Sequence, residues 1–243
     1  MRLNDDVELG DGSPIIYIRS LSLIACADLH LGYEGVLAKE GVFLPKYNLS
    51  FIENEIKKAI ERYKPKQILI DGDIKNEFSK VYVEEFNEFM DFMKFLNYYK
   101  VKVILVKGNH DNFIDRLKEP LGFEMYKQEH LIKNYLFFHG EELPKSKKGN
   151  FLIMGHVHPA IAIYNAITKE KLRCFLYGRF NGKEILILPA LSYYAEGVEV
   201  NNLANNLNEI SPIFNIIDFR ELEAYCLGED ETLYFGKIKD LVF

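Results

Sequence analysis

The chain has 243 residues, enough for one substantial hydrophobic core, and we expect a single domain over residues 1–243. The composition, 48% hydrophobic and 27% charged, is typical of a globular protein in water, and no apolar run is long enough to cross a membrane. A net charge of −6 disfavours a large nucleic-acid-binding surface, although it leaves room for a small phosphate-bearing substrate.

The N-terminal residues and the cysteines indicate where the protein resides. The first fourteen residues contain no apolar stretch of the kind that forms the centre of a signal peptide. The three cysteines, Cys26, Cys174 and Cys226, are an odd number without CxxC spacing, which argues against a disulfide framework. We therefore predict a reducing, cytoplasmic setting.

The first third of the chain predicts strands, an irregular segment and a helix. Apolar runs at residues 15–18 and 21–27 indicate two strands. The segment 32–48 contains three glycines and a proline, and we expect it to overhang a site. Ser50 and Glu53 have the spacing of a capping box, and apolar residues then recur at helical spacing until the next proline.

The middle of the chain continues this alternation. Residues 67–70 predict a strand, and an apolar stripe over about residues 80–98 predicts a helix. Residues 101–106 predict a buried strand that runs into Gly-Asn-His-Asp, and a short helix is expected near residues 113–118. Residues 131–138 predict a further strand.

The last third reads as mostly β-structure. Residues 151–154 predict a strand. Asn181-Gly182 lies between apolar runs at 172–180 and 185–188, which is a strong signal for a β-hairpin. The remaining segments, including 213–217 and 233–235, are expected to be β-rich with short turns.

The positions of the histidines carry most of the functional information. Five of the six stand at the ends of predicted strands, beside Asp, Asn or Gly. These five are His30, His110, His139, His156 and His158. The residues Asp28, Asp73 and Asn109 stand at the same strand ends, and chance placement would scatter such residues along the chain.

Imidazole nitrogens combined with carboxylate and amide oxygens form a ligand set for transition metals, whereas a calcium or magnesium site would be mostly oxygen. In the patterns Asp28-x-His30 and His156-x-His158, residues i and i+2 project to the same side and can reach a common centre. These candidate ligands are too many for one ion with open positions, and they suit two ions that share a carboxylate. We expect two divalent ions, manganese first, with iron, zinc, nickel and cobalt as alternatives.

The order of these motifs resembles that of the calcineurin-like metallophosphoesterase superfamily. The matching motifs span residues 28 to 158, and GNHD followed by GHxH is the most specific part. They are Asp28-Leu29-His30, Gly72-Asp73, Gly108-Asn109-His110-Asp111, His139-Gly140 and Gly155-His156-Val157-His158. The resemblance implies an α/β fold, a four-layer αββα sandwich of two mixed sheets flanked by helices.

The resemblance also implies roles for these residues. One metal would be held by Asp28, His30 and His158, the other by Asn109, His139 and His156, and Asp73 would bridge them. His110 would stay off the metals and act on the substrate phosphate as a catalytic residue, with Asp111 as its orienting partner. Spacing alone leaves Asp71 open as a ligand, because it lies two residues from Asp73; the family match selects Asp73.

The phrases DLHLGYEGVLAKEGVFLP and GDIKNEF resemble a branch of small archaeal and bacterial phosphoesterases, some of them encoded beside DNA ligase or helicase genes. Members of that branch often carry His where this chain has Asn76, which leaves the role of that position open. The resemblance implies an enzyme that hydrolyses phosphate esters. The first candidate is a phosphodiesterase acting on nucleotides or single-stranded nucleic acid. A phosphomonoesterase or protein phosphatase is the alternative, and a non-catalytic metal-binding scaffold comes third. Aromatic residues such as Tyr98 and Tyr193 would suit either a homodimer face or a second wall of the core.

Overall fold

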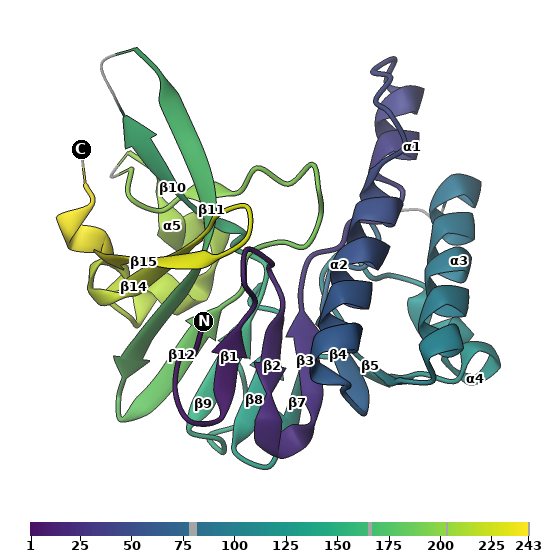
Figure 1. Cartoon of the computed structure of the whole chain (residues 1–243), viewed down its shortest axis with the longest axis horizontal. Coiled ribbons are helices and arrows are strands. Elements are labelled where there is room, and N and C mark those ends of the chain that lie inside the picture. Colours follow the sequence, from purple (N-terminus) through teal and green to yellow (C-terminus); the bar gives the residue numbers. More distant parts are fainter. Residues whose placement is uncertain (78–81, 165–166, 203, 243) are drawn as a thin grey trace.

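Two β-sheets pack face to face in the computed structural model, which describes residues 1–77, 82–164, 167–202 and 204–242 (Figure 1). The first sheet has the order β1-β2-β3-β4-β5-β6; strands β3 to β6 are mutually parallel, and β1 and β2 are antiparallel to their neighbours. Its strands are β1 (Val7–Leu9), β2 (Ile16–Ile18), β3 (Leu23–Cys26), β4 (Gln67–Asp71), β5 (Lys102–Val106) and β6 (Glu124–Tyr126).

The second sheet is also mixed and has the order β13-β10-β11-β12-β9-β8-β7, with β14 paired to β11 and β15 paired to β14. Its strands are β7 (Glu129–Ile132), β8 (Tyr135–Phe138), β9 (Phe151–Met154), β10 (Pro159–Tyr164), β11 (Lys169–Phe180), β12 (Lys183–Ile187), β13 (Val198–Glu199), β14 (Glu223–Leu227) and β15 (Thr232–Lys237). The upper part of β11 rises with β10 as an arm above the sheet (Figure 1).

Helices cover the outer faces of both sheets. The helices are α1 (Tyr33–Lys39), α2 (Asn48–Tyr63), α3 (Val83–Tyr99), α4 (Lys118–Leu121) and α5 (Leu207–Ile210). Helices α2 and α3 pack on the first sheet, while α5 and the 3-10 turns Pro212–Asn215 and Ile238–Asp240 cover the second. The predicted four-layer αββα arrangement of two mixed sheets is confirmed.

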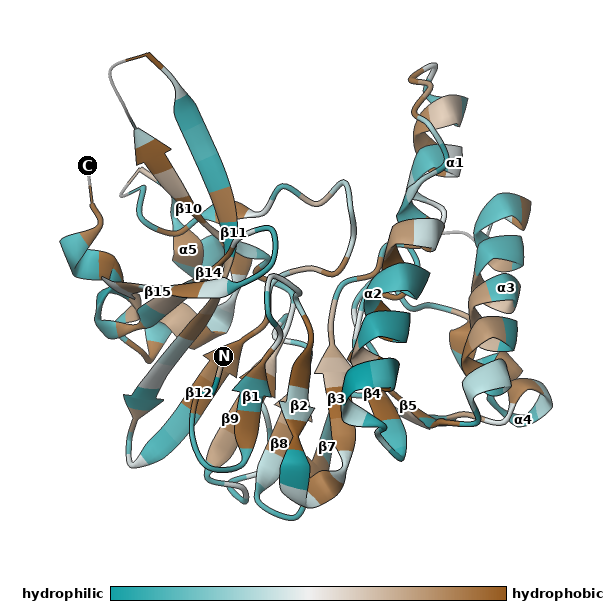
Figure 2. Cartoon of the chain, viewed as in Figure 1, coloured by the Kyte–Doolittle hydropathy of each residue, from teal (hydrophilic) through white to brown (hydrophobic). Residues whose placement is uncertain are grey.

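Strand β3 shows why these residues form a central strand. Ile24 and Cys26 pack toward the helices, whereas Leu23 and Ala25 pack into the layer between the sheets. All four residues are buried, as expected for a parallel strand covered on both faces. In Figure 2 the central strands are correspondingly hydrophobic, and α2 shows hydrophilic residues on its outer side. The carboxyl ends of the parallel strands meet at one edge of the sandwich, where functional groups of such sheets gather.

The Asn181-Gly182 turn joins β11 and β12 as predicted. Both residues have positive φ, 49° and 76°, the conformation that a two-residue hairpin turn requires. Most other strand predictions are confirmed within two residues at their ends. The strand expected over 131–138 is instead two strands, β7 and β8, because the chain turns at Lys133, where φ is 53°.

The predicted start of the first long helix is wrong. Helix α2 begins at Asn48, and Ser50 lies inside it with its hydroxyl donating to the carbonyl of Tyr47. The cap is supplied from a distance: Oε1 of Glu34 accepts hydrogen bonds from the backbone amides of Tyr47 and Asn48 at 2.9 and 2.8 Å. A carboxylate at a helix N-terminus satisfies orphan amides and complements the helix dipole.

Three further expectations differ from the structure in part. The irregular segment 32–48 contains α1, and the β-rich reading of 213–217 fails because Pro212–Asn215 form a 3-10 turn capped by Ser211. The helix expected from about residue 80 is described from Val83 onward, and residues 80 and 81 lie outside the described part. None of the helices in the described ranges has the length and apolar character that a membrane crossing requires.

Candidate metal centre

Five strands of the two sheets deliver polar side chains to one edge of the sandwich. Strands β3, β4 and β5 belong to the first sheet, and β8 and β9 to the second. The residues that follow these strand ends are Asp28 and His30 after β3, Asp73 after β4, Asn109 and His110 after β5, His139 after β8, and His156 and His158 after β9. The predicted convergence of strand ends therefore exists, and it draws on both sheets.

The backbone at these strand ends adopts a conformation that costs energy. Five of the residues have φ between 47° and 67°, in the left-handed region that non-glycine residues seldom occupy. They are Asp28, His30, Asp73, His156 and His158. Such conformations cluster at functional sites, where the surrounding structure enforces them in order to aim a side chain.

Two glycines allow the strand ends to approach closely. A Cβ on Gly72, whose φ is 79°, would lie 2.1 Å from Nδ1 of His139. A Cβ on Gly108 would lie 2.3 Å from Oδ1 of Asp73. Side chains at either position would push these groups apart, so glycine is required for the packing of the site.

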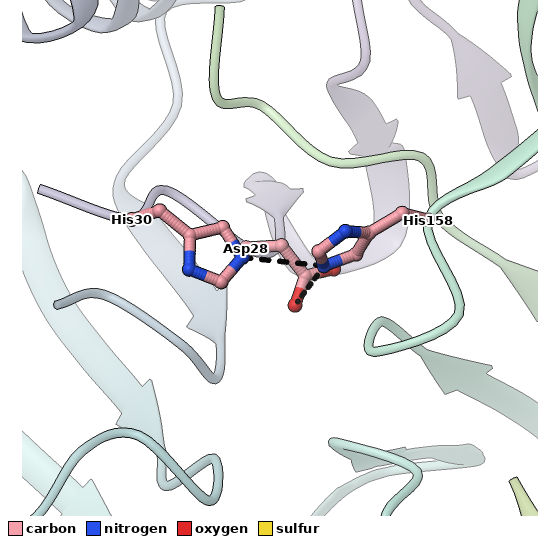
Figure 3. A group of neighbouring side chains, drawn as sticks. All are labelled: Asp28, His30 and His158. Carbon is pink, nitrogen blue, oxygen red and sulfur yellow. Dashed lines mark hydrogen bonds and ion pairs between the residues drawn. The ribbon is translucent and has the colours of Figure 1, made fainter. Parts of the chain in front are cut away.

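The first candidate group consists of Asp28, His30 and His158 (Figure 3). Nε2 of His158 lies 3.3 Å from both Nε2 of His30 and Oδ1 of Asp28. Figure 3 shows the two rings and the carboxylate turned toward one another, with the ring of His158 arriving from the opposite side to His30. All three ligand atoms lie within 4.8 Å of one another, which is close enough to share one ion.

The second candidate group consists of Asp73, His139 and His156, again with its ligand atoms within 4.8 Å of one another. Nε2 of His139 lies 3.2 Å from Oδ2 of Asp73, without the geometry of a hydrogen bond. Oδ1 of the nearby predicted ligand Asn109 is buried and has no hydrogen-bond partner in the described structure. Buried polar atoms that converge and yet leave one another unsatisfied are what a cation-binding site presents.

The rings of the second group are held by carbonyl oxygens. Nδ1 of His139 lies 2.9 Å from the carbonyl oxygen of Asp71, and Nε2 of His156 lies 3.0 Å from that of Ile210. A hydrogen bond from one ring nitrogen to a carbonyl fixes the tautomer and leaves the other nitrogen for a metal ion. The carboxyl group of Asp71 belongs to neither group.

The pKa directions fit a metal-binding role. Burial and the neighbouring His158 lower the pKa of His30 to about 4, and burial and His139 lower the pKa of His156. Both rings are therefore neutral near pH 7, the state that binds metals. Burial would lower the pKa of His139, but the carboxylates of Asp73 and Asp28 outweigh it and raise that pKa, so protons and cations compete for this ring.

His110 and Asp111 make different contacts from those predicted. Nδ1 of the His110 ring is in hydrogen-bond contact with the backbone carbonyl oxygen of Asn76, and Nε2 of the same ring lies 3.9 Å from Oδ2 of Asp73. The carboxylate of Asp111 accepts backbone amides instead, from Ile74 at 2.8 Å and Gly108 at 2.9 Å. Among the contacts described, Asp111 thus shapes the loop, and the carbonyl of Asn76 orients the His110 ring.

Sequence reasoning missed Asn48, a buried residue that joins two loops of the site. Its Nδ2 donates to the carbonyls of Leu29 and His30 at 3.0 and 3.1 Å. Its Oδ1 accepts from the hydroxyl of Ser192 at 3.1 Å and from the amide of Tyr193 at 2.8 Å. No spacing in the sequence could reveal this role, because Asn48 and Tyr193 are 145 positions apart.

Comparison with known proteins places this geometry in a family. The family model for calcineurin-like phosphoesterases matches residues 21–181, and the chain belongs to that family. With its two His/Asp groups, it is a metal-dependent phosphoesterase. No curated protein matches the chain in sequence.

A solved structure shares the fold, and a second one was compared. The nuclease MPE from Pseudomonas putida superposes with a TM-score of 0.66 at 18% identity, over 93% of this chain and 94% of that one. Yfce, a phosphoesterase from E. coli, gives a TM-score of 0.43 at 16% identity, over 88% of this chain and 98% of that one. Because the identity is only 18%, the similarity to the nuclease MPE establishes the shared fold and nothing further about this chain.

Proposed function

We propose that this protein is a dinuclear metal-dependent phosphodiesterase that hydrolyses nucleotide or nucleic-acid esters. The observation that carries the proposal is the pair of His/Asp groups built from both sheets at one edge, with His110 beside them. The shared fold of a bacterial nuclease is consistent with a diester substrate. Manganese is the first choice of metal, because nitrogen and oxygen ligands in this combination accept it.

Within this proposal each candidate ligand has one role. Asp28, His30 and His158 would hold one cation, Asn109, His139 and His156 would hold the other, and Asp73 would serve both. Asp73 contacts both groups, since its Oδ2 lies 3.2 Å from Nε2 of His139 and its carbonyl oxygen accepts the backbone amide of His30 at 3.0 Å.

When bound, a pair of divalent cations supplies positive charge for phosphate oxygens and makes water a nucleophile at neutral pH. The chain's own contribution to the reaction is centred on His110. With Nδ1 turned to the carbonyl of Asn76, the ring presents Nε2 to the site. A proton on Nε2 can stabilise the transferring phosphoryl group or pass to the leaving oxygen as general acid.

A panel of substrates tests the reaction class. Manganese-loaded protein would be assayed on bis-p-nitrophenyl phosphate, p-nitrophenyl phosphate, 2′,3′-cyclic nucleotides and single-stranded DNA. We expect the diesters to be hydrolysed with the higher kcat/KM. A clear preference for p-nitrophenyl phosphate would favour a phosphomonoesterase instead, and two bound metals without turnover of any substrate would favour a scaffold.

The substitution His110→Ala tests the assigned chemistry. Loss of one general acid should lower kcat by about 10²- to 10⁴-fold while the metal content stays the same. Metal content would be measured by elemental analysis beside kcat on bis-p-nitrophenyl phosphate. His130→Ala is the matched control, because His130 lies outside the motifs and stacks on Tyr126; it should change neither quantity. Loss of both metals in His110→Ala would show that the residue is a ligand.

A further inference from the structure

Three cationic side chains form a row on strand β11. Lys169, Lys171 and Arg173 are alternate residues of the strand, so they share one face and are spaced by roughly 6.6 Å. All three line one hollow of about 540 Å³, together with Phe51 of α2 and Tyr193 of the loop after β12. In Figure 1 the arm that carries the row and helix α2 stand on opposite sides of this loop.

Arg173 is held in place without a carboxylate partner. Its Nη1 donates to the carbonyls of Ala190 and Ser192 at 3.1 and 2.9 Å. Among the ion pairs of the described residues, none involves Arg173, and its described hydrogen bonds use Nη1 alone. An anchored guanidinium with its other donors available is suited to phosphate, whose oxygens match the planar fork.

The segment that anchors Arg173 also touches the metal centre. The amide of Ser192 donates to the carbonyl of Asp28 at 3.1 Å, and the amide of Leu191 donates to that of Ala27 at 2.9 Å. The guanidinium is thus separated from the first candidate group by one hydrogen-bonded segment.

The lysines of the row are paired with two glutamates of the same hollow. Lys169 lies 2.6 Å from a carboxylate oxygen of Glu199, and Lys171 lies 3.8 Å from the same oxygen and 3.7 Å from Oε2 of the exposed Glu196. Both lysine side chains remain partly exposed, and ion pairs of exposed lysines contribute little to stability, so a phosphate can replace these glutamates. The row is short, which is compatible with a protein whose net charge is −6.

Aromatic rings face the row across the hollow. The half-exposed ring of Tyr193 lies edge-on to Phe51 and Tyr47, with ring centroids 5.4 and 4.6 Å away. Cationic groups that follow a backbone, set against aromatic faces on which bases stack, are how proteins bind single-stranded nucleic acids.

We infer that Lys169, Lys171 and Arg173 bind successive phosphates of a single-stranded nucleic acid and lead it to the metal centre, while Tyr193 stacks on its bases. The inference rests on the proposed diesterase function and narrows the substrate to a strand with several phosphates. DNA and RNA share the chemistry that the row recognises, and the experiment separates them.

Binding at several salt concentrations tests the row directly. Fluorescence anisotropy would follow fluorescein-labelled 12-mers of oligo-dT and oligo-U on the full chain, with EDTA present to prevent cleavage. Three phosphate contacts predict a slope of log affinity against log salt of about −2.1. Lys169→Ala/Lys171→Ala should reduce the slope by about 1.4 units and Arg173→Ala by about 0.7 units. Whichever 12-mer shows these losses is the nucleic acid that the row recognises.

Matched control variants show whether binding depends on the residues of the row or only on the total positive charge of the protein. Lys237→Ala/Lys239→Ala removes two lysines that also share one glutamate, Glu221, and it should leave the slope unchanged. Tyr193→Ala should weaken binding by about tenfold, whereas Tyr98→Ala, at an exposed tyrosine of α3, should not. The lysine variant is the decisive one, since it leaves the anchors of the 190–192 segment intact. The inference is overturned if that variant binds both oligomers like the unchanged chain, or if the control double variant loses as much.

Turnover of bis-p-nitrophenyl phosphate keeps the two proposals apart. This small diester has a single phosphate and cannot span the row, so the unchanged chain should hydrolyse it whether or not the row binds an oligomer. Row-dependent oligomer binding without diester hydrolysis would remove the proposed function and leave the binding surface. Hydrolysis of the diester, combined with oligomer binding that the row variants leave unchanged, would remove the binding surface and leave the proposed function.

Discussion

The two His/Asp groups contain the same kinds of residue, but different contacts hold their side chains in place. Each contains a buried carboxylate, a buried histidine and a half-buried histidine. In the second group, His139 and His156 each direct their remaining nitrogen to a backbone carbonyl. In the first group, Nδ1 of His30 is buried without a hydrogen-bond partner in the described structure. Hydrogen bonds of this kind orient rings for a metal, so the second group is the better organised of the two.

The first group depends on its backbone instead. The amides of Asp28 and His30 donate to the carbonyls of Gly72 and Asp73 at 3.1 and 3.0 Å, which ties this loop to the next strand end. Both residues hold left-handed conformations that are strained for side chains other than glycine, as do Asp73 and His156 of the second group, so the difference between the groups lies in the ring contacts. The comparison teaches that equal ligand sets need not bind equally, and we expect the second group to have the higher affinity.

The largest effect should come from the residue that connects the groups. Asp73→Ala removes a ligand of the second group and, as proposed, the bridge to the first. Since each cation contributes several kcal/mol to transition-state stabilisation, turnover should fall by at least about 10³-fold. Elemental analysis should show at least one metal lost. Asp71→Asn, a buried neighbour outside both groups, should retain both metals; full occupancy in Asp73→Ala would refute the bridging role.

Single-ligand variants test which group binds more tightly. Calorimetric titration of metal-free protein with manganese should resolve two binding steps whose dissociation constants differ by about 10- to 100-fold. This is the usual loss of metal affinity when contacts that orient the ligands are removed. His30→Ala should keep the tighter step, and His139→Ala should abolish it. The reverse pattern would show that the carbonyl contacts of His139 and His156 do not set affinity.

The sequence could predict the ligands because their signal is local. Each candidate ligand lies in the few residues that follow a buried apolar strand, and neighbouring strands bring their ends together without further information. The hairpin at Asn181-Gly182 was predictable for the same reason. The split of β7 from β8 was not, because Lys133 carries no marker for positive φ.

Features that depend on distant partners could not be predicted. Glu34 caps α2 from another segment, so the helix begins without a capping residue of its own and a neighbouring Ser-x-x-Glu pattern suggested a different start. The contacts of Asp111 with Ile74 likewise join residues 37 positions apart. Arg173 and Tyr193 come together only when β11 and the loop after β12 are folded.

The smallest effect is expected at Asn48, which supports the first group from outside. Asn48→Ala removes the donors to the carbonyls of Leu29 and His30, so the loop that carries His30 should lose part of its orientation. We expect the weaker manganese step to weaken further by about tenfold while the tighter step stays unchanged, with calorimetry as the measurement.

Asn201→Ala is the matched control for Asn48, since Asn201 is an equally buried asparagine that bonds to Ala162 on β10 and to the carbonyl of Leu241. Both variants lose a buried amide and should be destabilised by a similar amount, about 1–3 kcal/mol. If Asn201→Ala weakened the same manganese step, the loss would reflect general destabilisation. If Asn48→Ala weakened both manganese-binding steps equally, Asn48 would support both groups. Any difference in affinity between the groups would then come only from the ring contacts of His139 and His156.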